Sequence, residues 1–427
     1  MQIKLDNAFD AHFIYVEDSQ DNTLNIIVRI VLDESILDSN INEALHNLIL
    51  KHPYLNGKVT ENHCDTAFPF SLTITRSLNI TSNIKDVNDK QIDNIICSIS
   101  EMRFYRFYTR KEPLIKVNIW KSDSRTLIEL CCPHLLTDLQ GGVILMGDFC
   151  NFLDLSISGD DTHILPCKRL IFDEVRYGWR QQASSIQALK IPPFHKDSTQ
   201  QWQKPNSQYQ RNYLHLHDYY QLKNWLEDNE IQAKVVDLLY YVVNKIYKTN
   251  YDIELSLLTT FGFRQLLSEE NEQKNINTSA VFFPIDMSDY KAETYKYWME
   301  NFYFKRNSKM TKEGVLQVIN YFRSINKSMN CFDSLYNRQV INQIKKMGAT
   351  FLINNIGSLD KFFNSYKHFN IVDIDIQDGV PGEELRMFGF KDKVYLNPMF
   401  KRSSPLSSNN FYSLFIDEIN NLTGLSL

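Results

Sequence analysis

The stretch TLIELCCPHLLTDLQGG at residues 126–142 decides the fold. Its first part, Thr126–Cys132, is a short apolar run and predicts a strand. A helical run is expected from Gly142 to Leu153. Between strand and helix come a histidine, an aspartate four residues later and a pair of glycines: His134, Asp138, Gly141 and Gly142. These residues therefore lie at a strand-to-helix junction, where a reactive side chain can be held by two regular elements.

This junction carries residues suited to acid–base chemistry. The ordinary pKa of an imidazole lies near neutral pH, so His134 is a candidate general base. Asp138 is a candidate to fix the loop by pairing with a cation. The alternative is structural: a satisfied histidine that caps the start of the helix. A His-x-x-x-Asp spacing also arises by chance, so the surrounding sequence has to decide between the two.

Composition bounds the class of protein. The chain has 427 residues, 43% of them hydrophobic and 23% charged, which predicts a globular protein of two or three domains or one two-lobed unit. The formal net charge of -5 argues against nucleic acid as the main partner, because such binding depends on lysine and arginine. Any basic site must be local.

No membrane or disulfide framework is expected. No apolar run reaches the 18 residues of a bilayer span, and the first ten residues contain acidic positions where a signal peptide needs an apolar core. We therefore expect a cytoplasmic protein without an integral membrane segment. The seven cysteines are an odd number and form no Cys-x-x-Cys pair, which favours reduced thiols over disulfides or a thiolate zinc site.

Two mixed halves flank a polar, proline-punctuated stretch. We divide the chain into an N-terminal lobe at 1–180, a linker at 181–206 and a C-terminal lobe at 207–427. Near the start, Thr23–Leu32 alternates as a half-buried strand does, and Asn40–Lys51 has helical spacing with a capping box of Asn40 and Glu43. Further helices and strands are expected at Ile92–Met102, Leu114–Trp120, Tyr213–His217, Ala233–Tyr247, Ile253–Gly262, Lys312–Asn326, Ser334–Met347, Thr350–Ile356, Ile371–Ile376 and Asn410–Leu422.

Four segments around the junction resemble one family in their order and approximate spacing. They are the helix-to-turn segment Ala44–Leu55, the Pro-Leu strand at Glu112–Val117, the strand Thr259–Arg264 that ends in arginine, and the Asn-x-Gly strand at Ile353–Ser358. Together with His134 and Asp138 they resemble the chloramphenicol-acetyltransferase-like acyltransferase superfamily. That superfamily includes condensation domains, wax-ester-synthase-like enzymes and alcohol acyltransferases.

The resemblance implies an α/β fold of two similar lobes, which form a pseudo-dimer around a central channel. It also implies a metal-free acyltransferase with no permanently bound cofactor. The donor would be an acyl-coenzyme A or an acyl-phosphopantetheine on a carrier protein acting in trans, and the acceptor a small alcohol or amine. We expect a monomer that serves lipid or natural-product biosynthesis, a part of secondary metabolism.

The resemblance also assigns roles to residues. It makes His134 the base and has Asp138 point away from the substrate to pair with an arginine, for which Arg264 is the candidate. Gly141 and Gly142 would support the loop, whose amides could approach an oxyanion. The channel candidates are Thr137, Leu139, Asn355 and Gly357. Arg264 can equally be a surface residue, and the glycines can equally serve turns or packing.

Two departures from the family pattern matter. Condensation domains usually have His-His-x-x-x-Asp-Gly, whereas this chain has Pro133 and Leu139 at the first and last positions. Pro133 argues against a standard peptide-forming condensation domain, and the side chain of Leu139 would narrow the channel. Met387–Lys391 resembles a C-terminal box of plant-type members only faintly. The alternatives are a non-catalytic docking or carrier-recognition module with a degenerate site, or an unrelated two-domain enzyme.

Two other patterns invite a functional interpretation. His215 and His217 would share one strand face and could bind zinc, although a surface strand without metal is the preferred interpretation. Arg103, Arg106 and Arg110 alternate with aromatic residues, as in nucleic-acid or phosphate sites. Their spacing of three and four also fits the solvated face of a helix end, which we prefer.

Overall fold

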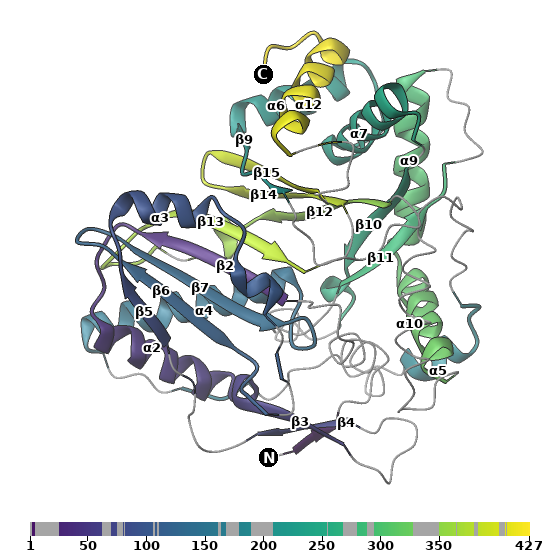
Figure 1. Ribbon diagram of the computed structural model, residues 1–427. Coiled ribbons are helices and arrows are strands. Elements are labelled where there is room, and N and C mark those ends of the chain that lie inside the picture. Colours follow the sequence, from purple (N-terminus) through teal and green to yellow (C-terminus); the bar gives the residue numbers. More distant parts are fainter. Residues whose placement is uncertain are drawn as a thin grey trace.

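The computed structural model has two large sheets and one small sheet, with helices packed around them (Figure 1). The structure describes residues 2–4, 25–61, 70–74, 80, 82–105, 107–108, 111–160, 164–167, 179–188, 208–253, 255–267, 280–287, 294–327, 350–363, 365–379, 383–400, 406 and 408–427. The small sheet has the order β1-β4-β3, formed by Gln2–Lys4, Phe70–Ile74 and Gly57–Glu61. The mixed α/β class expected from the sequence is confirmed.

The first large sheet, sheet B, holds the strand that leads to His134. Its order is β13-β2-β7-β6-β5, with bounds Ile371–Asp378, Asn25–Leu32, Thr126–Pro133, Lys116–Lys121 and Ser82–Asp86. The pairs β13–β2, β2–β7 and β7–β6 are antiparallel, and β6–β5 is parallel. β13 comes from the C-terminal half of the chain, so both halves contribute to this sheet.

β2 is a central strand buried on both faces, and the prediction of a half-buried strand is wrong. All eight residues of Asn25–Leu32 are buried. Ile26 and Val28 face helix α4 (Leu139–Ser158), and their methyl groups lie where a Cβ on Gly142 would be. Val31, on the opposite face, packs in a separate cluster with helix α3 (Asp89–Ile96). The alternating apolar pattern does not predict burial of this second face, although that face also carries apolar side chains such as Val31.

A buried polar row crosses sheet B on the α3 face. Arg29 pairs in register with Glu129 of β7, and its Nε donates to the Glu129 carboxylate at 2.6 Å. The Arg29 guanidinium also donates to the carbonyl oxygens of Ile95 and Ser98 at the end of α3. Asn118 on β6 donates to the second oxygen of Glu129. These bonds attach the α3 segment to the sheet.

The helices of this half start differently from the prediction. Helix α2 (Asp38–Lys51) begins two residues before Asn40, and its N-cap is Leu37, which provides no side-chain cap. The predicted capping box of Asn40 and Glu43 is therefore wrong. The box forms instead at α3, between Asn88 and Gln91. The expected helix to Met102 ends at Ile96 and is followed by the 3-10 turn η2 (Glu101–Phe104).

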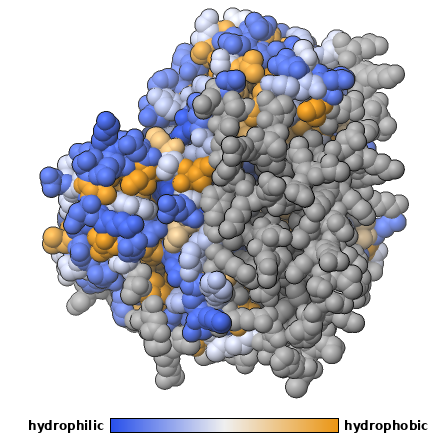
Figure 2. Space-filling model, viewed as in Figure 1, coloured by the Kyte–Doolittle hydropathy of each residue, from blue (hydrophilic) through white to orange (hydrophobic). Residues whose placement is uncertain are grey.

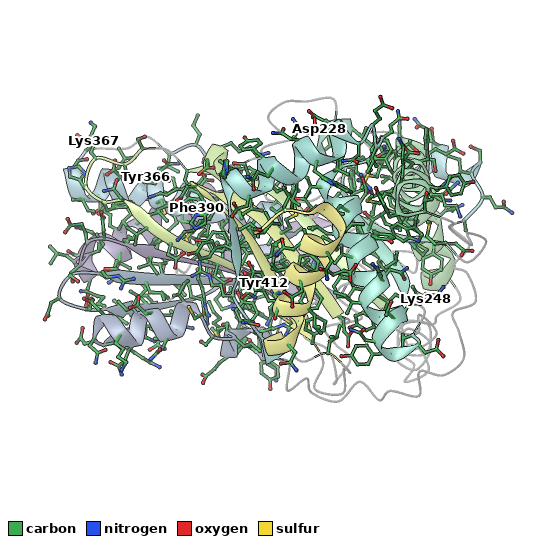
Figure 3. All side chains as sticks on the ribbon, turned by 90° about the horizontal axis from the view of Figure 1, so that it is seen from above. Asp228, Lys248, Tyr366, Lys367, Phe390 and Tyr412 are labelled. Carbon is green, nitrogen blue, oxygen red and sulfur yellow. The ribbon has the colours of Figure 1, made fainter. Side chains whose placement is uncertain are left out.

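The second large sheet, sheet C, belongs to the C-terminal half. Its order is β11-β10-β12-β14-β15-β8, with β9 also on β15, and the bounds are Ala280–Ile285, Ser256–Gly262, Thr350–Ser358, Glu383–Phe390, Lys393–Phe400, Gln208–Tyr209 and Tyr213–His215. The helices α6, α7, α9, α10 and α12 accompany it, at Leu216–Asp228, Val235–Tyr251, Tyr295–Lys309, Lys312–Lys327 and Ser408–Thr423. Helix α12 lies over the sheet, where Tyr412 donates to the carbonyl of Tyr213 (Figure 3).

The two halves also meet beyond sheet B. The loop before β13 docks on α4, since the backbone N–H groups of Lys367 and His368 donate to the Asp154 carboxylate. Tyr366 and Lys367 are labelled in Figure 3 at the end of the molecule away from α7. On the face shown in Figure 2 the described surface is mainly hydrophilic, with small hydrophobic groups. No helix in the described ranges combines the length and apolarity of a membrane span.

Several other predictions can be compared with the structure. β9 ends at His215 and α6 begins at Leu216, so His215 and His217 do not share a strand face. The expected helices near Lys312–Asn326 and Asn410–Leu422 are confirmed as α10 and α12, whereas Ser334–Met347 lies outside the described residues. Most of the 181–206 segment also lies outside them, and its first residues continue helix α5 (Trp179–Ser184). The division into lobes stays a prediction.

We expect Arg29→Met to lower the free energy of unfolding by about 3–5 kcal/mol, because it leaves the Glu129 carboxylate buried without its cation. Urea denaturation followed by circular dichroism measures the change. Lys223→Ala is the matched control, since it removes one partner of an exposed pair with Glu227 and should leave the midpoint unchanged. Equal midpoints for Arg29→Met and wild type would contradict the role of the buried row.

Candidate active site

The loop of residues 134–138 joins β7 to α4 at one end of sheet B. β7 ends at Pro133, which pairs with Asn25 of β2, and α4 begins at Leu139. Asp138 is the N-cap of α4: its Oδ1 accepts from the backbone N–H of Gly141 at 2.8 Å. An aspartate suits this position because its carboxylate accepts from an otherwise unpaired helix N–H. Its negative charge also interacts favourably with the positive end of the helix dipole. The loop is therefore tied to the first turn of α4.

Asp138 is also locked to the other half of the chain. Both terminal nitrogens of Arg264, which opens the 3-10 turn η3 (Arg264–Leu266) after β10, donate to its carboxylate at 2.7 Å. The two side chains are buried, with 4% and 5% of their surface exposed. The pairing of Asp138 with Arg264 that the resemblance implied is thus present, and Arg264 is not a surface residue. A two-point Arg–carboxylate contact fixes orientation as well as distance.

His134 is not part of this ion pair. Its residue surface is partly exposed, while its Nδ1 atom is buried. Burial lowers the pKa of His134 below its ordinary value of 6.5, while a hydrogen bond with its own backbone carbonyl and the charges of Asp138 and Asp378 oppose the change. Burial penalises the charged form of an imidazole and so favours the neutral form. The lowered pKa leaves the His134 ring neutral at neutral pH.

The two glycines have structural roles. A Cβ at Gly142 would lie 2.7 Å from the Ile26 Cγ2 atom, so glycine lets α4 pack directly on β2. The Gly141 N–H bonds to the Asp138 carboxylate and the Gly142 N–H to the Asp138 carbonyl. These two amides are thus engaged with Asp138, and the approach of loop amides around Leu139–Gly142 to an oxyanion stays a prediction.

The four channel candidates divide into two pairs. Thr137 is fully buried, and its hydroxyl donates to the Asp138 carbonyl; Leu139 is buried in the main hydrophobic cluster. Asn355 and Gly357 are exposed and form a bulge of β12, in which Gly357 has a φ of 80° and its N–H donates to the Asn355 side chain. The Asn-x-Gly motif thus has a local structural explanation, since only glycine adopts this φ without strain.

The segment Ala44–Leu55 also has a structural explanation. His52 lies buried between the Tyr54 hydroxyl, 2.6 Å from Nδ1, and the Asp148 carboxylate, 2.7 Å from Nε2. Asp148 belongs to α4 and also accepts from Lys51. This chain of contacts joins the end of α2 to α4, and burial lowers the pKa of His52 as well. The segment therefore supports the helix that carries the His134 loop.

Sequence analysis missed a cluster of buried charges at the same end of sheet B. Arg103 is buried, and its Nε donates to the Asp378 carbonyl at 2.6 Å, so the prediction of a solvated arginine face is wrong for this residue. Arg106 and Arg110 lie outside the described residues. Asp378 in turn accepts from Arg386 of β14 at 2.8 Å. No sequence signal identified this cluster, because Arg103 is 275 residues from Asp378.

No family model and no curated protein sequence matches the chain. Solved structures match it over almost its whole length. The condensation domain of the Monacolin K polyketide synthase MokA has a TM-score of 0.69 at 10% identity, covering 99% of this chain and 98% of that chain. A mutant starter condensation domain of rhizomide synthetase RzmA, in complex with C8-CoA, has 0.67 at 11% identity, covering 100% and 95%.

A third similar structure is the trichothecene 15-O-acetyltransferase TRI3 from Fusarium sporotrichioides, with a TM-score of 0.65 at 11% identity, covering 98% of this chain and 94% of that chain. At these identities the likeness establishes the fold. The chain has a mixed α/β fold similar to that of these condensation domains and of the O-acetyltransferase, which confirms the expected fold class. The pseudo-dimer and the central channel stay predictions.

We expect Arg264→Met to lower the free energy of unfolding by about 3–5 kcal/mol, because Asp138 would remain as a buried, unpaired charge. Asp138→Asn should also be destabilising, through the cap and the unpaired arginine. In the double variant the two losses should not add, because no lone charge is left in the pocket. Urea denaturation of the four proteins measures this cycle, and strictly additive losses would contradict the coupling.

Proposed function

We propose that this protein is an acyltransferase that moves an acyl group from a coenzyme A or carrier-protein thioester to an alcohol or amine, with His134 as general base. The observation that carries the proposal is the separation of roles in the loop. His134 is partly exposed and favours its neutral form, while Asp138 is buried and engaged by Arg264. A base needs access to the acceptor, whereas a supporting carboxylate needs a fixed partner.

In the proposed reaction the His134 ring takes the proton from the acceptor hydroxyl or amine as that atom attacks the thioester carbonyl carbon. A tetrahedral intermediate forms, the carbon–sulfur bond breaks, and the imidazolium returns its proton to the departing thiolate. The products are an ester or amide and a free thiol. No acyl-enzyme is needed, because the two substrates react with each other directly.

The fold supports this class of reaction. The similar structures include an O-acetyltransferase and a starter condensation domain in complex with C8-CoA. By analogy with them we propose a central channel between two pseudo-symmetric lobes, divided at 181–206, with donor and acceptor meeting at His134. We also propose a monomer that acts in the cytoplasm on lipids or natural products. Thr137, Leu139, Asn355 and Gly357 stay candidates for contacts along the channel.

The competing proposal is a docking module without activity, and Pro133 is the residue that favours it. Pro133 replaces the first histidine of the family motif, and it is the buried last residue of β7. Since a proline there continues the ladder to β2 and leaves His134 in the loop, we prefer the catalytic proposal.

We expect His134→Ala to lower acceptor-dependent thiol release by about 10²–10⁴-fold, the contribution of a general base. The assay uses acyl-coenzyme A donors of increasing chain length, then acylated carrier proteins, with mixed alcohol and amine acceptors. His46→Ala is the matched control, because it removes an exposed histidine of α2. No acceptor-dependent thiol release by the wild type with either kind of donor would favour the docking module, and so would equal rates for wild type and His134→Ala.

The pH dependence should report the same base. Because the pKa of His134 is lowered, the ring stays neutral as the pH falls through 6.5 and is protonated only at lower pH. We therefore expect kcat/KM to fall as the pH is lowered, with the midpoint of the fall at a pH below 6.5. A profile of kcat/KM from about pH 4.5 to 9 measures this. A midpoint above 6.5 would contradict a desolvated His134 as the base.

A further inference from the structure

Four buried charged side chains gather where the chain passes from sheet B to sheet C. They are Arg103 of η2, Asp378 at the end of β13, and Glu384 and Arg386 of β14, which we call the Asp378 cluster. None of the four is more than 4% exposed. Two positive and two negative groups so deeply buried are costly unless they are mutually compensated, so their position near the His134 loop calls for an explanation.

Asp378 is the central member of the cluster. Its carboxylate accepts from Arg386 Nη2 at 2.8 Å, and its backbone carbonyl accepts from Arg103 Nε at 2.6 Å. Arg386 also forms an ion pair with Glu384, so its charge is shared between two carboxylates. Burial and the neighbouring Arg386 lower the pKa of Arg103 to about 9, which still leaves it charged at neutral pH. Asp378 is thus held by Arg386 at its carboxylate and by Arg103 at its backbone.

Strand register places Asp378 at the same end of sheet B as the His134 loop. Asp378 is opposite Ile26, and Ile26 is opposite Cys132, so the three side chains form one row on one face of sheet B. This is the face on which α4 packs, because Ile26 contacts the position of Gly142. The next row continues the ladder, since the Gly379 N–H donates to the carbonyl of Asn25 and Asn25 is opposite Pro133. Asp378 therefore ends its strand two strands away from the start of the loop.

The charged groups around His134 come from four other segments. Asp138 is on its own loop with Arg264 of η3 bound to it, and Asp378 of β13 is held by Arg386 and Arg103. The negative charges of Asp138 and Asp378 both act on the ring, and they oppose the effect of burial on its pKa. Asp138 is engaged at two points by its arginine, whereas Arg386 divides its charge between Asp378 and Glu384.

We infer that Asp378 is a positioning residue of the His134 site, whose carboxylate stabilises the imidazolium that forms when His134 takes the proton from the acceptor. The inference rests on the proposed role of His134 as the base. Asp378 does not touch the substrate in this scheme. It acts through the histidine, and its position is fixed by Arg386, which binds its carboxylate, and by Arg103, which binds its backbone carbonyl.

The test measures His134 in the full-length protein without any substrate. Exchange of the imidazole C2 proton for deuterium, followed by mass spectrometry of the peptide that contains His134 over a pH series, reports the protonation midpoint of that ring. We expect Asp378→Asn to lower the midpoint by about one pH unit, because a negative charge near the ring is lost. Arg386→Gln should raise it, because a positive charge is lost and the Asp378 carboxylate is less compensated.

The midpoint is expected to fall in Asp378→Asn and to rise in Arg386→Gln, and these opposite directions distinguish an electrostatic effect from a loosened structure. A variant that merely exposes the ring to water should raise the midpoint toward 6.5, whichever charge is removed. Asp373→Asn is the matched control, since Asp373 lies on β13 in a part-exposed pair with Arg211, and it should leave the midpoint unchanged. An unchanged or raised midpoint in folded Asp378→Asn would overturn the inference.

A second comparison covers the case in which Asp378→Asn fails to fold. The double variant Asp378→Asn with Arg386→Gln differs from Arg386→Gln only in the charge of Asp378, because Glu384 loses its arginine in both proteins. Its midpoint should lie below that of Arg386→Gln alone, and an equal or higher midpoint would overturn the inference. Failure of acyl transfer in the wild type would reject the proposed function without changing these midpoints.

With an active donor and acceptor, kinetics add an independent measurement. Asp378→Asn should lower kcat by about tenfold or more with little change in KM, and Asp378→Glu should restore part of the loss. A rise in KM at unchanged kcat would instead assign Asp378 to substrate binding and contradict a role exerted through His134.

Discussion

The ion pair between Asp138 and Arg264 is the contact on which the rest of the site depends. A buried carboxylate is stable only when its oxygens are satisfied, and here one aspartate accepts from Arg264 and from the Gly141 N–H that opens α4. Through these bonds the loop after β7, the first turn of α4 and the end of β10 are joined at one point. The loop that carries His134 is thus attached to β7 at one end and to the first turn of α4 at the other, and Arg264 holds it through Asp138.

This constraint explains how His and Asp, four residues apart, come to differ so much in environment. The aspartate is turned toward the arginine and away from solvent, while the histidine keeps part of its surface exposed. Burial lowers the pKa of His134. A neutral imidazole on a rigid loop is suited to accepting a proton, whereas a mobile or protonated one is not.

The seam between the halves shows the same principle on a larger scale. β13 joins sheet B beside β2, yet its acidic side chains Asp373, Asp375 and Asp378 bind Arg211, Tyr209 and Arg386 of the C-terminal half. Toward the N-terminal half, Gln377 of the same strand bonds to the segment after α3. Each buried polar group is useful only if its partners come from the correct register, so this seam selects one arrangement of the two halves.

The sequence by itself determined the elements nearest the site. The apolar run, the histidine, the aspartate and the glycines predicted a strand, a loop and a helix, and those elements form as β7, residues 134–138 and α4. The order of the other landmarks led to the acyltransferase fold and to Arg264 as the partner of Asp138. Such features are local, or follow from a pattern in chain order, and are therefore visible in one sequence.

Only the tertiary structure decided which faces and charges are buried. Sequence periodicity made β2 half-exposed and Arg103 solvated, but β2 is covered on both faces and Arg103 lies against Asp378, 275 residues away. Burial and charge pairing depend on segments far apart in the chain, and neither local propensity nor spacing contains that information.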